Sequence, residues 1–201
     1  MAPKATCTCV RMQFLRGSGI AYTYRSNPDN GQQAMPESRA VNQESAEGTG
    51  LRGREALRDA MPPLLARAQR EVAVFAARPE PSYLDNERFV AELAAFAARH
   101  RQNLVRLLVD DPVVLAREHV RLAEVLRRLS DAIQLRGIAE HDRGRPDLFV
   151  LIDRREYLLL PDGSGIDGRH GAARREAIAL SETFEDMWAR GIPASLRPLG
   201  L

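Results

Sequence analysis

Two adjacent acids, Asp110 and Asp111, follow an apolar run at residues 103–109 and come directly before Pro112. If the run is a parallel strand, these carboxylates lie at its carboxyl end, where open α/β sheets usually bind ligands. The same triplet is also typical of a turn and of the cap that begins a helix. Both interpretations are open from the sequence, so the two acids are candidate ligand-binding residues.

A second set of candidates carries positive charge. His119, Arg121 and Arg128 could share one face of a helix, with Arg136 nearby, and so form a pocket for an anion. Acidic residues are interleaved with them, and that spacing is equally typical of a solvated helix surface. The sequence therefore gives an anion site and an ordinary helix surface as alternatives.

Other patterns that could support catalysis are incomplete. Cys7 and Cys9 form one Cys-x-Cys pair without a second pair, and the four histidines do not repeat at metal-ligand spacing. No Ser-His-Asp, Cys-His or paired-carboxylate arrangement can be isolated. The glycine-rich segment 163–171 lacks the lysine and the frame of a phosphate loop, so we expect a flexible connection there. We predict no catalytic residue, metal or cofactor.

The elements that must position the candidates are regular from residue 51 onward. Apolar residues recur at helical spacing around 57–68, 89–97, 115–129 and 178–190, and we expect Pro62-Pro63 to kink or restart the first helix. Strands are expected at 71–77, 103–109 and 132–136, and then around Phe149 and Leu158. Helices between strands favour parallel pairing. The predicted fold class is α/β, with a mixed, mostly parallel sheet and helices on both faces.

Composition divides the chain and limits its partners. Residues 1–50 are polar and rich in glycine, without a sustained apolar period, so we predict a disordered tail followed by one α/β domain at 51–201. The net charge is only +2, which gives no basic excess that would favour nucleic acid or an anionic membrane. No run approaches the length of a membrane span, and no secretory signal is apparent. We therefore expect a cytoplasmic protein.

The run 148–152 reads as a buried strand that ends in Asp153. This layout resembles the signature strand of the phospholipase D-like superfamily, whose motif is His-x-Lys followed, after four residues, by Asp. With Asp153 in the acid position, Pro146 occupies the histidine position and Leu148 the lysine position. Proline offers no nucleophile and leucine no charge, so the resemblance implies the scaffold without its phosphohistidine chemistry. Asp153 is either a ligand-binding acid or a strand-end acid that bonds the next turn.

The resemblance covers about residues 51–192. The helix with Phe184 and Trp188 is similar to the closing helix of a phospholipase D-like half, and we expect both aromatic residues to be core anchors, as we expect Phe149 and Leu151 to face the core. More closely, the chain resembles uncharacterised bacterial domains of this type that are sometimes attached to a GNAT-type acetyltransferase. Their resemblance implies a protein partner of that kind.

Three functions follow from these patterns. The first is a non-catalytic domain that binds a ligand or a protein partner, in which Asp110, Asp111, His119, Arg121, Arg136 and Asp153 are the candidate ligand-binding residues. The second is a phosphodiester-processing or nucleic-acid-binding protein with a divergent site. The third is a structural subunit that forms a homodimer. Near-neutral charge and the missing nucleophile favour the first.

Overall fold

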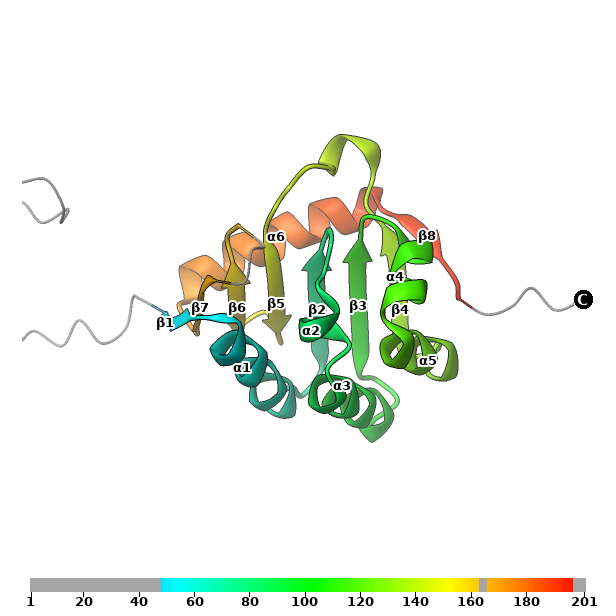
Figure 1. Cartoon of the computed structure of the whole chain (residues 1–201), viewed down its shortest axis with the longest axis horizontal. Helices are drawn as coiled ribbons and strands as arrows, with labels where there is room; N and C mark the ends of the chain where they lie inside the picture. The colour runs from blue at the N-terminus through cyan, green and yellow to red at the C-terminus, as the bar shows by residue number, and fades with distance from the viewer. Residues whose placement is uncertain (1–47, 163–165, 197–201) are drawn as a thin grey trace, which may run out of the picture. The chain divides into compact units, whose positions relative to one another are not determined.

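The apolar runs predicted as strands form the centre of one eight-stranded sheet (Figure 1). The computed structural model describes residues 48–162 and 166–196, all within the second of two units, which comprises residues 41–201. The strands, in chain order, are β1 (Thr49–Arg52), β2 (Glu71–Ala76), β3 (Leu104–Val109), β4 (Ile133–Gly137), β5 (Leu148–Ile152), β6 (Glu156–Leu160), β7 (Asp167–Gly171) and β8 (Ile192–Ala194).

Helices separate the first strands and follow the last hairpins. They are α1 (Arg54–Ala66), α2 (Pro81–Leu84), α3 (Glu87–Arg99), α4 (Pro112–Glu118), α5 (Val120–Arg128), the 3₁₀ helix η1 (Glu140–Asp142) and α6 (Arg174–Arg190). None of these helices has the length and apolar character that spanning a lipid bilayer requires.

The sheet is mixed, in the order β1-β7-β6-β5-β2-β3-β4-β8. Only β2, β3 and β4 are mutually parallel, and every other neighbouring pair is antiparallel. The predicted predominance of parallel pairing therefore holds for the three helix-connected strands alone. The β5–β6 connection is too short for a crossover, so these two strands form a hairpin instead.

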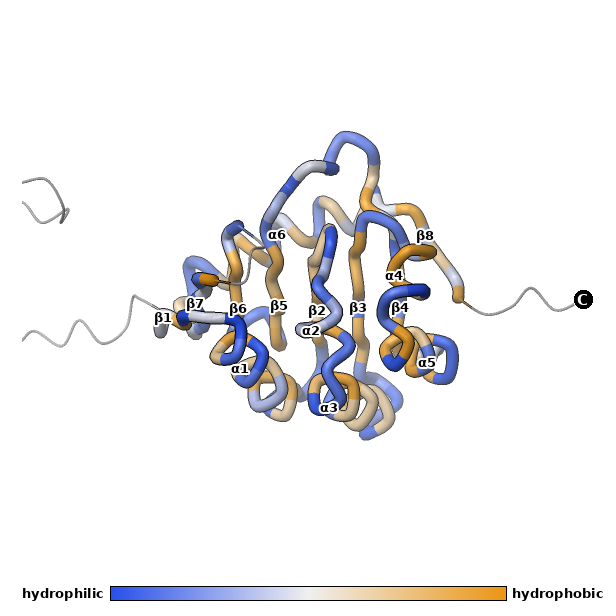
Figure 2. The backbone as a smooth tube through the Cα atoms, viewed as in Figure 1, coloured by the Kyte–Doolittle hydropathy of each residue, from blue (hydrophilic) through white to orange (hydrophobic). Residues whose placement is uncertain are grey.

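Helices cover both faces of the sheet, as predicted, but unequally. The helices α1 to α5 lie on one face, and α6 lies alone across the other (Figure 1). Val72 and Val74 of β2 belong to the cluster under α1, α3 and α5, while Ala73 and Phe75 belong to the cluster under α6. This alternation explains why the central strands read as continuous apolar runs, which appear as orange tubes in Figure 2.

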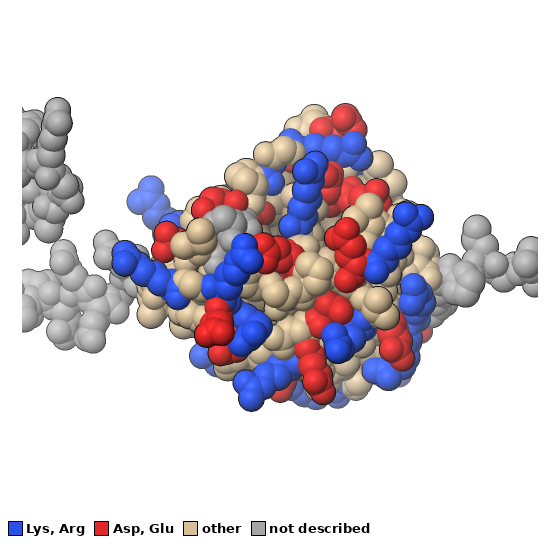
Figure 3. Space-filling model, viewed as in Figure 1, with Lys and Arg blue, Asp and Glu red and all other residues tan. Residues whose placement is uncertain are grey.

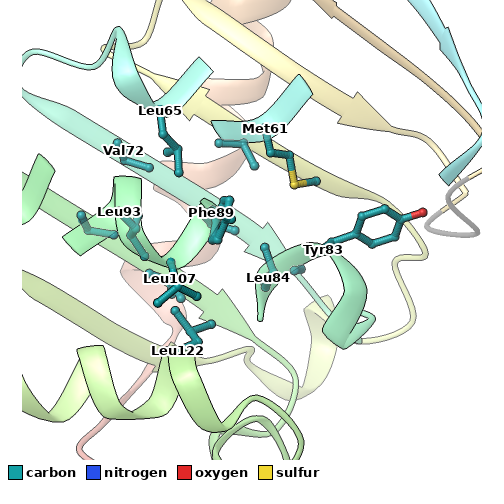
Figure 4. Close-up of a cluster of buried hydrophobic side chains, with 14 of the residues drawn as sticks. Met61, Leu65, Val72, Tyr83, Leu84, Phe89, Leu93, Leu107 and Leu122 are labelled. Carbon is teal, nitrogen blue, oxygen red and sulfur yellow. The ribbon is translucent and has the colours of Figure 1, made fainter. Parts of the chain in front are cut away.

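The larger cluster is mainly aliphatic. Figure 4 shows side chains from α1, β2, α2, α3, β3 and α5 meeting in one layer, among them Met61, Leu65, Phe89, Leu107 and Leu122. All of these side chains are buried. The layer fixes the three parallel strands against their crossover helices and so sets the edge at which their carboxyl ends meet.

The smaller cluster confirms the predicted aromatic anchors. Phe149 and Leu151 are buried beneath α6, where Phe149 lies 6.4 Å from Phe184 and Phe184 lies 5.6 Å from Trp188 between ring centroids. The guanidinium carbon of Arg106 lies 4.9 Å from the centre of the Phe184 ring. Offset and edge-on aromatic pairs add to the stabilisation that burial gives, so α6 is held by packing along its whole apolar face.

Arg106 brings charge into this apolar interface. Its side chain is 8% exposed, and it donates hydrogen bonds to the carboxylates of Glu71 and Glu185. Arg154 donates to the same two carboxylates, at 3.0 and 2.7 Å. Two arginines and two glutamates therefore form one network, and the buried guanidinium is compensated.

Two features of the helices differ from the sequence predictions. Helix α1 continues through Pro62-Pro63, because the carbonyls that lose their donors belong to Arg58 and Asp59, neither of which is buried. The helix predicted at 115–129 is two helices that meet at His119.

Strand pairing also extends beyond the predicted boundaries. Strand β1 begins at Thr49, two residues inside the segment predicted as a tail, and pairs with β7. Gly168 and Gly171, which were predicted to lie in a flexible connection, belong to β7. A Cβ atom at Gly168 would lie 2.3 Å from Cδ2 of Leu57, so close packing on α1 requires glycine there. Residues 1–47 of the predicted tail, and residues 163–165, lie outside the described residues.

Candidate functional site at the carboxyl edge of the parallel strands

The candidate site lies where β2 and β3 end and β5 begins. Because β5 runs antiparallel to β2, its first residue Leu148 pairs with Ala76, the last residue of β2. Asp110 follows β3 directly and its backbone N–H donates to the carbonyl of Ala77. The segment between β4 and β5, which contains η1, arches over this edge of the sheet (Figure 1). The edge is therefore built from the ends of three strands and one long connection.

Two adjoining cavities open at this edge. One, of about 370 Å³, is lined by residues 76–78, Asp110, residues 144–148 and Asp162. The other, of about 450 Å³, lies between the ends of β6 and β7 and the first half of α6. Arg145, Pro146 and Asp147 line both. A ligand in either cavity would touch the residues that precede β5.

Charged side chains dominate the polar lining of the first cavity. The Asp110 carboxylate pairs with Nε of Arg78 at 3.6 Å and with Nε of Arg143 at 3.2 Å. Arg145 donates two hydrogen bonds to Asp147, at 3.0 and 2.7 Å, and its guanidinium carbon lies 5.7 Å from the Phe75 ring centre. The hydrogen bonds to Asp147 raise the pKa of Arg145, and the partial burial of Arg145 lowers that pKa by a smaller amount. The cavity thus presents guanidinium groups and carboxylates in nearly compensating pairs.

The second cavity contains a different polar arrangement. Arg169 of β7 and the hydroxyl of the buried Tyr157 both donate to the carboxylate of Glu176 at the start of α6. Burial and the carboxylate together raise the pKa of Tyr157 to about 12. The hydroxyl is therefore a donor and not a base at neutral pH.

Pro146 and Leu148, which the sequence resemblance set at the His and Lys positions of the motif, lie at this same edge. Pro146 lines both cavities and Leu148 lines the first, with its side chain in the core cluster under α1 and α3. Among the described histidines, none lines either cavity. His141 pairs with Asp142 at 3.2 Å, and the ring of His170 lies 3.5 Å from Arg67. No imidazole of the described part is thus placed to attack a phosphorus atom bound here.

The structure places the predicted site residues in several locations. Asp110 lies in the first cavity, whereas Asp111 caps α4 and accepts hydrogen bonds from Val113 and Val114 at 2.7 and 3.2 Å. Arg136 donates to the carbonyl of Trp188 at 2.6 Å, and its guanidinium carbon lies 4.6 Å from that ring. Asp111 and Arg136 therefore act as a helix cap and as an anchor for the end of α6, and ligand binding by them remains a prediction.

His119 and Arg121 do not share a pocket. The break between α4 and α5 turns His119 inward, where it is 1% exposed, while Arg121 points to solvent and pairs with Asp85 at 3.6 Å. Burial lowers the pKa of His119, against the opposing influence of Asp85 and of the Leu115 carbonyl. Positions i and i+2 also lie about 200° apart around an α-helix, so a continuous helix would not have brought the two side chains together either.

Asp153 lies at the other end of β5. Its carboxylate accepts hydrogen bonds from the backbone N–H groups of Gln69, Arg70 and Glu71, at 2.9, 2.8 and 2.9 Å. The acid thus ties the β5–β6 turn to the start of β2, which is the strand-end role that the sequence left open.

Sequence reasoning missed Arg78, Arg143, Arg145 and Asp147. Arg78 could have been found by the rule that selected Asp110, because it follows a predicted parallel strand in the same way. The other three lie in the connection before β5, and only its path over the sheet brings them to the edge. Within the described ranges, no group of three or more His, Cys, Asp or Glu side chains could hold a metal ion.

The fold is similar to that of solved phospholipase D family members. Nuc from Salmonella typhimurium, a phospholipase D family member, aligns with a TM-score of 0.51 at 14% identity, over 74% of this chain and 99% of Nuc. NucT from Helicobacter pylori aligns with a TM-score of 0.52 at 9% identity, over 74% of this chain and 99% of NucT.

The chain belongs to the family described as Domain of unknown function (DUF7931), whose sequence model matches residues 53–199. A third similar structure is TrmBL2, an archaeal chromatin protein described as showing a novel mode of DNA binding. It aligns with a TM-score of 0.53 at 14% identity over 77% of this chain, which spans 57% of the length of TrmBL2. Comparison with curated proteins gave no match.

Proposed function

We propose that this chain is a non-catalytic phospholipase D-like domain that binds a ligand or a protein partner at the carboxyl edge of its parallel strands. The observation that carries the proposal is the pair Pro146 and Leu148, which stand at the cavity where the motif would place a nucleophile and a phosphate-binding lysine. Hydrolysis through a phosphohistidine needs an imidazole at this point, and neither residue can replace it.

The test is hydrolysis of a generic phosphodiester, bis(p-nitrophenyl) phosphate, by the purified full chain. We expect no release of p-nitrophenol above a buffer blank or above a mock purification from cells that carry an empty vector. Turnover that His141→Ala or His170→Ala abolishes would show that a displaced histidine acts as nucleophile, and the non-catalytic proposal would then be wrong.

The lining indicates what kind of ligand the edge would take. Arg78 and Arg145 line the first cavity and Arg143 pairs with its Asp110, but each of these guanidinium groups already has a carboxylate partner. A ligand must replace these arginine–carboxylate ion pairs with ion pairs of its own. A protein partner that carries both acidic and basic side chains therefore fits better than a simple anion. The resemblance to domains attached to acetyltransferases makes an enzyme of the GNAT type the partner that we propose.

This partner can be tested by gel filtration of the purified chain mixed with a GNAT-type acetyltransferase from the same genome. We expect co-elution, which Asp110→Arg should weaken because it reverses one charge at the edge. Arg117→Gln changes an exposed arginine of α4 and serves as the control. Separate elution of the two proteins, or equal effects of both substitutions, would contradict this partner.

Nucleic-acid binding is the second candidate, and the likeness to a DNA-binding chromatin protein favours it. The charge distribution speaks against it, because arginines and acids are interspersed over the face in Figure 3 and the net charge is only +2. Fluorescence anisotropy of a labelled DNA duplex would decide between the two. Binding whose affinity falls steeply with added salt would support this second candidate.

A further inference from the structure

We propose that the amino-terminal edge of the parallel strands is an anion-binding site in which Arg70 and Arg155 take a phosphate group. This edge lies at the opposite end of β5 from Pro146, so the site is independent of the function proposed above. It comprises the turn that enters β2 and the hairpin turn between β5 and β6.

A cavity of about 310 Å³ lies at this edge. It is lined on one side by residues 67 and 69–71 and on the other by residues 152–156. Four of these residues are arginines, namely Arg67, Arg70, Arg154 and Arg155. The volume is sufficient for a phosphate group and a small organic substituent.

The carboxylates of this cavity already have hydrogen-bond or ion-pair partners within the protein. Both oxygens of Asp153 accept backbone hydrogen bonds from the turn that enters β2. Glu71 pairs with Arg106 and Arg154, and Glu156 pairs with Arg67 at 2.6 Å. Two arginine charges of the cavity, those of Arg67 and Arg154, are therefore compensated by carboxylates.

The other two arginines are not compensated. Arg70 donates to the neutral amide oxygen of Gln102 at 2.6 Å, and no carboxylate of the described residues pairs with it. The side chain of Arg155 makes no hydrogen bond or ion pair with any described residue. Two arginines without a carboxylate partner thus line one cavity, in contrast to the paired arginines at the opposite edge.

The backbone presents Arg155 in a fixed position. Asp153 and Arg154 have φ values of 50° and 59°, and the Arg155 N–H donates to the Ile152 carbonyl at 2.9 Å, so residues 152–155 form a tight turn within the three-residue connection between β5 and β6. Glycine is the usual residue in such a turn, and these are the non-glycine residues with positive φ in the described part of the chain. The Asp153 and Arg154 side chains are fixed by their partners, so Arg155 projects from a rigid turn.

A phosphate group fits these donors best. The planar guanidinium fork matches two oxygens of a tetrahedral oxyanion, and two arginines together neutralise its charge at neutral pH. The phosphate could belong to free orthophosphate or to a small phosphomonoester. The two sources share the chemistry at the arginines and differ only in the substituent that the cavity would enclose.

Isothermal titration calorimetry of the full chain in a phosphate-free and sulfate-free buffer tests the site, with orthophosphate and glycerol 3-phosphate as the two probes. We expect saturable binding with one site per chain. Arg70→Gln and Arg155→Gln should each weaken it at least about tenfold, because each removes a charge-assisted contact. Tighter binding of glycerol 3-phosphate would assign the site to a monoester, and equal binding would assign it to orthophosphate.

The matched control is Arg117→Gln, which removes an exposed arginine without a described partner on α4. This variant should bind both probes as the wild type does, and all variants should keep the wild-type melting temperature, since the substituted side chains are exposed. The proposal is overturned if neither probe binds saturably at millimolar concentration. It is overturned equally if Arg117→Gln weakens binding as much as Arg155→Gln does.

Discussion

The carboxylate of Asp153 accepts the backbone N–H of Arg70 at 2.8 Å and so joins the β5–β6 turn to the start of β2 across 83 positions of the sequence. Two further backbone N–H groups bind the same carboxylate. Asp153, the position that resembles the acid of the phospholipase D-like motif, therefore has a structural role in this fold.

Replacing Asp153 should destabilise the fold. Asp153→Ala leaves three backbone donors without a protein partner, and because the site is half-buried we expect a loss of about 2 kcal/mol in the free energy of unfolding. Urea denaturation measures this loss. Asp167→Ala, which removes an exposed acid paired with Arg52 only at 3.9 Å, is the control and should change stability by less than about 0.5 kcal/mol. Equal effects of the two substitutions would contradict the role assigned to Asp153.

Arg106→Met should lower the free energy of unfolding more than Asp153→Ala does. It leaves Glu71 and Glu185 facing each other under α6 with only Arg154 between them, and breaking a buried charge pair in this way costs about 3–5 kcal/mol. Arg154→Met removes the exposed arginine of the same network and should cost no more than about 1 kcal/mol. The melting temperature of Arg106→Met should therefore lie clearly below that of Arg154→Met. A smaller loss for Arg106→Met than for Arg154→Met would show that the buried arginine is not the centre of the network.

His119 should make the protein less stable in mild acid. Burial lowers the pKa of its imidazole in the folded state, so as pH falls below the ordinary value of about 6.5 the unfolded chain takes up a proton before the folded chain does. The stability that the neutral ring contributes is present above that value and is lost as pH falls toward the folded pKa. His119→Leu should flatten this pH dependence in urea denaturation at pH 7 and pH 5. A slope that persists in His119→Leu would refute the assignment.

Tyr157 should ionise late in an alkaline titration. Its pKa is raised to about 12, chiefly by burial and then by the hydrogen bond to Glu176. Since the unfolded chain ionises this tyrosine near its ordinary value of about 10, the stability from Tyr157 is complete below that pH and is lost as pH rises through the folded pKa. Absorbance of tyrosinate should show late titration of Tyr157, besides that of Tyr83, whose pKa burial also raises, and Glu176→Gln should shift the Tyr157 transition to lower pH. An unchanged transition in Glu176→Gln would show that the carboxylate does not hold the phenol.

The sequence by itself determined the elements and the identity of the core. Continuous apolar runs such as Leu148–Ile152 predicted strands buried on both faces, and the spacing of Phe184 and Trp188 predicted the buried face of α6. These patterns are readable because burial acts on side chains at fixed periods of two or about 3.6 residues. It was also clear from the sequence that Pro146 and Leu148 carry no nucleophilic side chain, because that holds in any fold.

Tertiary structure alone decided which charged residues meet. Asp110 and Asp153 both follow apolar strands in the sequence, yet β3 and β5 run in opposite directions, so the two acids lie at opposite edges of the sheet. Strand direction depends on the length and path of connections far from either acid, and no local pattern encodes it. For the same reason, Arg70 and Arg155 lie 85 positions apart in the chain and line one cavity only because the hairpin turn of β5 and β6 folds against the start of β2.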